Sequence, residues 1–158
     1  MQHDQLRRTL LAAAGAAALL ALPALAQQEK RASRAEAEAL VKKAIDFYRK
    51  NGRDKAMAEF VRNPGPFVDR DLYVTVYTMQ GECLAHINPK MVGKVMLELR
   101  DGNGKYHIRE RIEAAARSSS GWHDLSFFNP VSKKIEPKEM YWEKYDALVF
   151  ACGAYKAA

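Results

Sequence analysis

The chain has 158 residues, a length typical of a single domain. A composition of 48% hydrophobic and 28% charged residues excludes a disordered chain, and two cysteines, nine glycines and six prolines exclude a disulfide scaffold or a fibrous protein. The net charge of +6 comes from scattered Lys and Arg, which indicates an ordinary solvated surface, with an acidic ligand or an envelope surface as the alternative.

Residues 1–26 are predicted to be a signal peptide. Arg7 and Arg8 precede an apolar run over residues 9–22, and the Ala24-Leu25-Ala26 motif provides a cleavage site. The run is shorter than the roughly 20 residues of a spanning helix, although a retained membrane anchor is the alternative. We therefore expect a periplasmic protein with no membrane span after cleavage and no nucleic-acid partner. The paired arginines leave the twin-arginine route open beside the general export route.

After a linker over residues 27–35, one domain is predicted over residues 36–156. Its first element is a long amphipathic helix over residues 35–51, because apolar residues recur at steps of three and one. This stripe consists of Ala37, Leu40, Val41, Ala44, Ile45 and Tyr48. Asn51-Gly52 ends the helix, and Asp54 is expected to cap a second, short helix that runs to Val61.

The period then changes to two, which is typical of strands. Residues 72–79 and 82–87 form a predicted hairpin around Gln80-Gly81, and a long crossover carries a helix over residues 106–116. Three further strands are predicted over residues 122–128, 139–145 and 147–155.

Strands that are segregated from helices predict an α+β fold. We expect a PAS-like, five-stranded antiparallel sheet, with the long N-terminal helix behind one face and the helical crossover over the pocket face. In that order the first strand separates the strands of Cys83 and Cys152 by roughly 9–10 Å, beyond disulfide reach. Two buried free thiols are therefore expected, with a disulfide as the alternative that an exported protein favours.

Several segments, in the correct order, resemble the single Cache domain family, specifically its second single type. These segments are residues 67–74, 81–86, 88–94, 101–106, Arg109-Glu110, Gly121-Trp122, 129–138 and the ending through 155–156. The resemblance implies an extracytoplasmic sensory domain that binds small molecules, often carboxylates, in a pocket over the sheet. Family members are often flanked by membrane helices and followed by a signalling module. Because this chain ends at Ala158, we expect a free-standing periplasmic form that passes its state to a partner.

The chemistry-bearing residues lack the patterns of metal or catalytic sites. His86, His107 and His123 have none of the close ligand spacings that metal sites show, and Ser118 to Ser120 lack a nucleophile elbow. We therefore expect no metal, no cofactor and no enzymatic activity.

A small carboxylate needs a cation and hydrogen-bond donors in a partly dry pocket. Arg109 on the crossover helix is predicted to be the principal cation, with His86 and Tyr141 as supporting donors. The other candidate ligand-binding residues are Tyr77, Trp122 and Lys94. Each has a structural alternative: an ion pair with Glu113 for Arg109, a satisfied strand histidine for His86, a solvated Lys94, and a core position for Trp122.

The predicted function is a periplasmic sensory domain for a small organic acid. Its expected partners are a small organic anion such as a carboxylate, and an envelope sensor kinase, chemoreceptor or transporter. An envelope interaction protein with a side-chain-filled pocket is the first alternative, and an unrecognised enzyme is the second.

Overall fold

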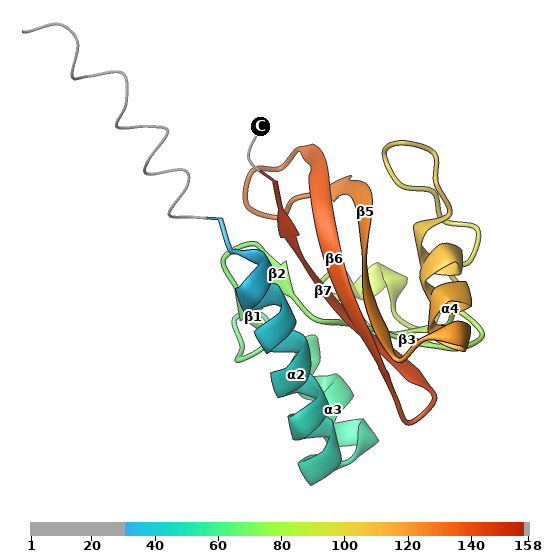
Figure 1. Ribbon diagram of the computed structural model, residues 1–158. Coiled ribbons are helices and arrows are strands. Elements are labelled where there is room, and N and C mark those ends of the chain that lie inside the picture. The colour runs from blue at the N-terminus through green and yellow to red at the C-terminus, as the bar shows by residue number, and fades with distance from the viewer. Residues whose placement is uncertain (1–30, 157–158) are drawn as a thin grey trace, which may run out of the picture. The chain divides into compact units, whose positions relative to one another are not determined.

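The computed structural model describes residues 31–156 (Figure 1). The predicted signal peptide and residues 27–30 of the predicted linker lie outside these residues, and the last two residues of that linker belong to the first helix. The helices are α2 (Arg34–Asn51), α3 (Arg53–Phe60), the short 3-10 helix η1 (Pro89–Met91) and α4 (His107–Arg117). The strands are β1 (Val68–Asp69), β2 (Leu72–Tyr73), β3 (Thr75–Thr78), β4 (Cys83–Ala85), β5 (Ser120–Phe128), β6 (Ile135–Tyr145) and β7 (Leu148–Tyr155).

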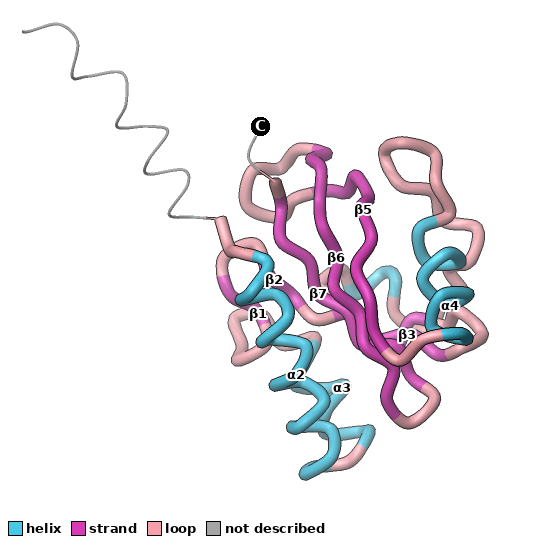
Figure 2. Tube along the Cα trace, in the orientation of Figure 1, coloured by secondary structure: helices cyan, strands magenta, loops and turns pink. Residues whose placement is uncertain are grey.

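Five strands form an antiparallel sheet in the order β4-β3-β7-β6-β5, and β1 and β2 form a separate small hairpin. Figure 1 shows α2 and α3 on one side of this sheet and α4 on the other, and Figure 2 shows how the loops join these layers. The α+β class, the strand order and the two-sided helix arrangement are as predicted.

Helix α2 begins at a capping box, in which the Ser33 hydroxyl accepts the Glu36 backbone N–H and the Glu36 carboxylate accepts the Ser33 N–H. It ends at Gly52, whose φ of 79° favours glycine. All six residues of the predicted stripe are buried, as expected. Helix α3 differs from the prediction: Gly52 is its N-cap and no side chain caps it, so Asp54 lies in the first turn instead.

The sheet face under α2 is covered by apolar side chains. Phe60, Phe67 and Phe150 are fully buried and pack edge to face, with 4.7 Å between the ring centroids of Phe60 and Phe67 and 6.2 Å between those of Phe60 and Phe150. Tyr48 from α2 packs on Phe150 at 5.4 Å. This side of the molecule therefore has an ordinary hydrophobic core.

Helix α4 covers the opposite face and buries a different kind of surface. Ile108, Ile112 and Ala115 pack toward the sheet, but His107 and Arg111 are buried with them. The apolar part of this layer also contains residues from the strands, namely Tyr77, Cys83, Leu125, Met140, Trp142, Val149 and Ala151.

The crossover between β4 and α4 folds back on both edges of the sheet. At the β4 edge, Cys83 N–H donates to Lys94 O at 2.9 Å and Gly93 N–H donates to Cys83 O at 2.8 Å. At the β5 edge, Gly102 N–H donates to Ser126 O at 2.8 Å, and Ser126 N–H donates to Asp101 Oδ2 at 2.9 Å.

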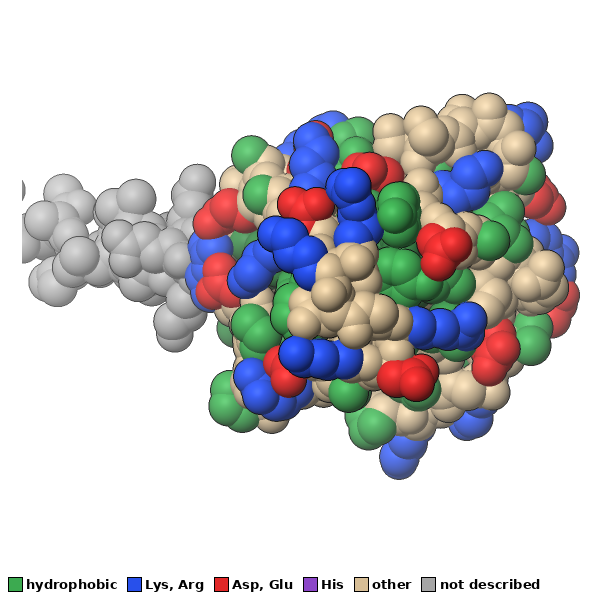
Figure 3. Space-filling model, turned by 90° about the horizontal axis from the view of Figure 1, so that it is seen from below, with side chains coloured by type: hydrophobic (Ala, Val, Ile, Leu, Met, Phe, Trp, Pro, Cys, Tyr) green, Lys and Arg blue, Asp and Glu red, His purple; other side chains and the backbone are tan. Residues whose placement is uncertain are grey.

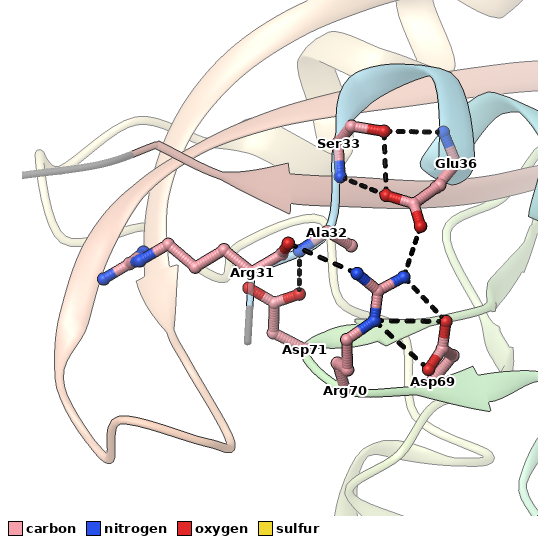
Figure 4. Close-up of polar contacts among 7 residues, drawn as sticks. All are labelled: Arg31, Ala32, Ser33, Glu36, Asp69, Arg70 and Asp71. Carbon is pink, nitrogen blue, oxygen red and sulfur yellow. Dashed lines mark hydrogen bonds and ion pairs between the residues drawn. The ribbon is translucent and has the colours of Figure 1, made fainter. Parts of the chain in front are cut away.

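A polar network fastens the start of α2 to the β1–β2 hairpin (Figure 4). Arg70 forms ion pairs with Asp69 and with Glu36, and its guanidinium also donates to Arg31 O. Asp71 Oδ1 accepts the Ala32 N–H at 2.9 Å. The segment that leads into α2 is thereby tied to the strand that leads into the sheet.

Cys83 and Cys152 are buried free thiols, as predicted. They belong to cores on opposite sheet faces, Cys83 under α4 and Cys152 under α2. Burial raises the pKa of Cys83 to about 11 and that of Cys152 to about 12, so both side chains are protonated at neutral pH.

On the face in Figure 3, Lys and Arg side chains lie interspersed with Asp and Glu side chains. This arrangement agrees with the solvated surface expected from the scattered charges. Within residues 31–156, no helix has the length and apolar character needed to cross a membrane.

Candidate ligand-binding site

A cavity of about 370 Å³ opens near η1 and the end of β5. It is lined by Asn63, Tyr73, His86, Ile87, Asn88, Met91, Phe127, Phe128 and Pro130. Its lining is mainly apolar with a few polar groups, which is typical of small-molecule sites. Three of these lining rings, those of Tyr73, His86 and Phe127, lie between the cavity and the polar interior under α4.

Lys138 lies in that interior and is only 1% exposed. Its Nζ donates to Tyr155 Oη at 3.3 Å and lies 4.1 Å from the Tyr73 ring centroid and 4.3 Å from that of Tyr155. Gly153 on β7 leaves the space for it, because a Cβ there would lie 2.7 Å from Lys138 Cε. An ammonium has three N–H donors, so two of them lack a side-chain acceptor here.

Arg111 is the second buried cation, also 1% exposed. It projects from α4 between Ile108 and Ile112, on the helix face that contacts the sheet. Its Nε and Nη2 lie 3.4 and 3.2 Å from the same atom, His123 Nε2, and its guanidinium carbon lies 5.8 Å from the Tyr77 ring centroid. One imidazole nitrogen cannot satisfy the five N–H groups of a guanidinium.

Neither cation has an acidic partner among residues 31–156, since none of the ion pairs found there includes Arg111 or Lys138. Asp71 is a buried carboxyl on whose pKa the charge of Lys138 acts. Its Oδ1 accepts the Ala32 N–H, whereas its Oδ2 is buried without a hydrogen-bond partner. Burial raises the pKa of Asp71 above its ordinary value, although the hydrogen bond from Ala32 and the charge of Lys138 act in the opposite direction.

Three histidines surround the two cations and are uncharged at neutral pH. Burial, followed by the charges of Lys138 and Arg111, lowers the pKa of His86 to about 3. Burial and then Arg111 lower the pKa of His107 to about 4 and that of His123 to about 2. His86 Nδ1 accepts the Asn88 N–H at 2.9 Å, so its Nε2 carries the proton and can donate.

Aromatic rings separate the cavity from the cations. The His86 ring centroid lies 5.3 Å from that of Tyr73 and 6.3 Å from that of Phe127. Phe127 in turn packs on His107 at 5.4 Å. Tyr73, His86 and Phe127 therefore form the inner wall of the cavity.

The predicted site residues are divided among different parts of the structure. His86 and Tyr77 lie on the α4 side, next to the buried cations. Arg109 does not lie over the sheet as expected: it is partly exposed, pairs with Glu98 and stacks on Tyr106. The reason is helical geometry, since one step of about 100° from buried Ile108 turns Arg109 away, whereas three steps bring Arg111 back to the same face.

Tyr141 and Trp122 lie under α2, on the face opposite the cavity. Their side chains pack together at 5.2 Å, Arg34 stacks on Trp122 at 4.1 Å, and Tyr141 Oη donates to Glu143 at 2.9 Å. Strand alternation places Lys138 and Met140 on one face of β6 and Tyr141 on the other. Lys94 is exposed, as its solvated alternative anticipated.

Sequence reasoning missed Arg111 and Lys138, although both carry a readable signal. Arg111 lies three residues after Ile108 and one residue before Ile112, inside the apolar stripe of its helix. Lys138 has the same parity as Met140 on a strand that alternates. A cation at a core position is informative because charged residues are rarely fully buried without a partner.

No group of three or more His, Cys, Asp or Glu side chains within residues 31–156 is placed to hold a metal ion. The arrangement instead offers donors: His86 and Tyr73 line the small cavity, and the cations Arg111 and Lys138 are buried behind its aromatic wall. Such a set of groups can bind an anion and orient it.

Solved structures support the fold. A methyl-accepting chemotaxis protein from Vibrio parahaemolyticus RIMD 2210633 aligns with a TM-score of 0.64 and 24% identity over 85% of this chain and 92% of that one. A periplasmic sensor domain of a chemotaxis protein aligns with a TM-score of 0.61 and 22% identity over 86% and 99%. A Cache chemosensory domain described for carboxylic acid recognition aligns with a TM-score of 0.65 and 14% identity over 85% and 98%.

A search of curated protein sequences finds no match to this chain. The model of the family described as single Cache domain 2 matches residues 7–155, which is nearly the whole chain and confirms the resemblance carried by its motifs. The chain belongs to the single Cache domain 2 family.

Proposed function

We propose that the protein is a periplasmic ligand-sensing domain that binds a small organic carboxylate between the sheet and α4. Arg111 and Lys138 are its cations in place of the Arg109 expected from sequence, with His86, Tyr73 and Tyr77 as further ligand contacts. The domain acts without catalysis and passes its state to a separate envelope partner, such as a sensor kinase, a chemoreceptor or a transporter.

One observation carries the proposal: Arg111 and Lys138 are both buried with unused donors, and neither forms an ion pair within residues 31–156. Burial of an unpaired charge costs several kcal/mol, so a fold retains such groups where an occupant compensates them. A carboxylate supplies both the charge and the acceptors, and charge-assisted hydrogen bonds are the strongest that it can make. The carboxylic acid recognised by one structural neighbour is consistent with this chemistry.

The periplasmic location rests on the signal-peptide pattern in residues 1–26 and on the periplasmic sensor domain among the neighbours. Periplasmic extraction followed by N-terminal sequencing tests it. A mature chain that begins near Gln27 supports the location, whereas an intact Met1 chain in the membrane fraction contradicts it.

Thermal unfolding with a panel of small carboxylates, amino acids and amines tests the ligand class, and calorimetry then measures the affinity of each hit. A ligand at 100 times its dissociation constant adds roughly 2.7 kcal/mol of stability. Arg111→Met and Lys138→Met are expected to weaken carboxylate binding by roughly 10- to 150-fold, the equivalent of a lost charged hydrogen bond.

Arg109→Met and Lys134→Met are the matched controls, because Arg109 lies on the same helix but faces outward and Lys134 is exposed. Both are expected to keep the wild-type affinity. If Arg109→Met abolishes binding and Arg111→Met leaves it unchanged, the site lies on the outer side of α4. If amines but no carboxylates stabilise the protein, the proposed ligand class is wrong.

A further inference from the structure

We propose that the connection between β5 and β6 docks the protein reversibly on a membrane surface that carries anionic phospholipids. This connection, residues 128–135, is called the β5–β6 tip below. Docking there does not depend on the ligand proposed for the interior under α4. Three features of the tip carry the proposal: exposed apolar side chains, lysines without acidic partners, and a backbone that is fixed before binding.

The tip exposes apolar side chains that no other element covers. Phe128 is 46% exposed, Val131 45% and Ile135 60%. Phe128 and Ile135 are register partners, so their Cβ atoms lie about 4.5–5.5 Å apart, and Val131 lies in the turn between the two strands. Scattered exposed apolar residues are ordinary, but a group of them on one turn marks an interaction site.

The charge at the tip is positive. Lys133 and Lys134 are exposed, and neither belongs to an ion pair found among residues 31–156. Residues 128–135 contain no Asp or Glu. Glu136, which follows directly, is already paired with Arg31 through two N–O contacts of 3.0 Å each. The tip therefore presents two uncompensated positive charges beside its three apolar side chains.

One buried asparagine fixes the backbone of the tip. Asn129 is 2% exposed; its Oδ1 accepts the Val131 N–H at 2.9 Å, and its Nδ2 donates to Glu136 Oε2 at 2.8 Å. Its backbone N–H donates to Lys134 O at 2.8 Å, and its backbone O accepts the Lys133 N–H at 2.9 Å. Because these bonds already order the turn, docking does not have to pay the entropy of ordering a loop.

The turn itself does not explain its lysine. Lys133 has a φ of 61°, in the left-handed region that glycine and asparagine adopt more readily than lysine. A turn chosen only for its geometry would carry one of those residues at this position. The lysine therefore points to a role for its charge.

A lipid surface fits this combination of groups better than a protein does. Three side chains that are about half exposed offer a few hundred Å² at most, below the roughly 800 Å² that each partner contributes to a stable protein interface. Shallow insertion of apolar side chains needs no such area when lysines lie at the level of anionic lipid headgroups. The occupant that complements both the apolar and the positive groups is an anionic membrane surface.

Vesicle sedimentation tests the proposal on the chain that begins at Gln27. This chain keeps every described helix and strand and lacks the apolar run over residues 9–22, which would bind lipid by itself. Vesicles of phosphatidylethanolamine with about 30% phosphatidylglycerol are compared with vesicles of phosphatidylcholine alone. We expect binding to the anionic vesicles to be at least tenfold stronger at low salt, and to weaken as the salt is raised to about 0.3 M.

Two double variants separate the contributions of charge and insertion. Lys133→Gln with Lys134→Gln should lower the partition coefficient on anionic vesicles about 25-fold, because each lysine near such a surface contributes about fivefold. Val131→Ser with Ile135→Ser should lower it tenfold or more, because the inserted side chains are lost. Neither Val131 nor Ile135 lines the cavity, so the second variant leaves the cavity walls in place.

The matched controls lie elsewhere on the domain. Lys50 and Lys55 are exposed lysines outside the ion pairs found, at the end of α2 and in α3. Val95 is 64% exposed and bridges Glu82 beside β4, at the sheet edge opposite β5. Lys50→Gln with Lys55→Gln, and Val95→Ser, should both bind vesicles as the wild type does.

No binding to anionic vesicles at low salt would overturn the proposal, and so would equal losses in the tip variants and the controls. If vesicles are not bound but a cross-linker at Lys133 captures an envelope protein, the tip docks on a protein and the lipid proposal is wrong. Thermal unfolding checks that each variant is folded, and Val131→Ser alone replaces the double variant if Ile135→Ser unfolds the domain.

Discussion

The two faces of the sheet are both covered by helices, but one buries mainly apolar side chains and the other also buries charged ones. Under α2, aromatic rings and aliphatic side chains fill the space, and Phe60 and Phe150 are fully buried. Under α4, the same sheet buries Arg111 and Lys138 among histidines and tyrosines. One face is therefore an ordinary apolar core, and the other buries unpaired charges that we propose to bind a ligand, at a cost in stability.

The largest expected effect lies on the apolar face. Phe60→Ala removes a fully buried ring that packs against three other phenylalanines, and such truncations cost about 3–5 kcal/mol. Phe128→Ala is the matched control because that side chain is 46% exposed. Urea unfolding measures the free energy of unfolding of both variants. Equal losses of stability would contradict the contrast between the buried Phe60 and the exposed Phe128.

On the polar face the sign is expected to reverse. Arg111→Met replaces a buried, unpaired charge by an apolar side chain of similar length, which should stabilise the ligand-free protein by about 1–4 kcal/mol. Urea unfolding without ligand measures this change, and Arg117→Met, at an exposed position of the same helix, is expected to have almost no effect. A large loss of stability in Arg111→Met would show that the guanidinium is a structural group.

Acid should weaken the polar face first. His86, His107 and His123 have folded pKa values of about 3, 4 and 2, below the ordinary value of 6.5, so the unfolded chain binds more protons as the pH falls through 6.5. Stability is complete above pH 6.5 and declines below it, by up to about 1.4 kcal/mol per pH unit for each histidine. Unfolding at pH 7, 6 and 5, above the range where most carboxylates titrate, measures the slope.

His86→Gln should reduce that slope by the share of one histidine. If the pH dependence of stability is unchanged in this variant, His86 is already charged in the folded protein. Three positive charges, those of His86, Arg111 and Lys138, would then be buried under α4.

The smallest effect is expected at the junction of the two faces. Ser33→Ala removes the capping box of α2 and should cost about 1 kcal/mol of unfolding free energy, the usual value for a lost N-cap. Because Ser33 lies at the start of α2 and away from the cations, carboxylate affinity should stay at the wild-type value. A loss of affinity measured by calorimetry would show that the α2 attachment and the ligand site are coupled.

Much of the fold could be predicted because its signals are local. The apolar stripe of α2 predicts which of its residues face the sheet, and the change to a period of two predicts where the strands begin. The PAS-like strand order then predicts that one strand lies between the strands of Cys83 and Cys152. The orientation of α4 was equally readable, but Arg109 was chosen for its place next to Ile108, and adjacency on a helix means a turn of about 100°.

Lys138 was missed for a different reason. The predicted fourth strand began at residue 139, so Lys138 fell just outside it; a proline such as Pro137 cannot donate to a sheet and is uncommon inside a strand. In the structure, β6 begins at Ile135, and its pairing with β7 begins only at Lys138, so Pro137 lies outside that ladder. The neutral histidines and the unpartnered Asp71 oxygen depend on burial by distant segments, which no local pattern contains.

The crossover that folds back on β4 and β5 also affects how this protein meets other chains. An open sheet has two edges whose free N–H and C=O groups invite strand addition and aggregation. Here Lys94 and Gly93 take up both backbone groups of Cys83 at one edge, and Gly102 and Asp101 do the same for Ser126 at the other. The crossover therefore interrupts both edges of the sheet at these residues, which should hinder edge-to-edge association between copies of the protein.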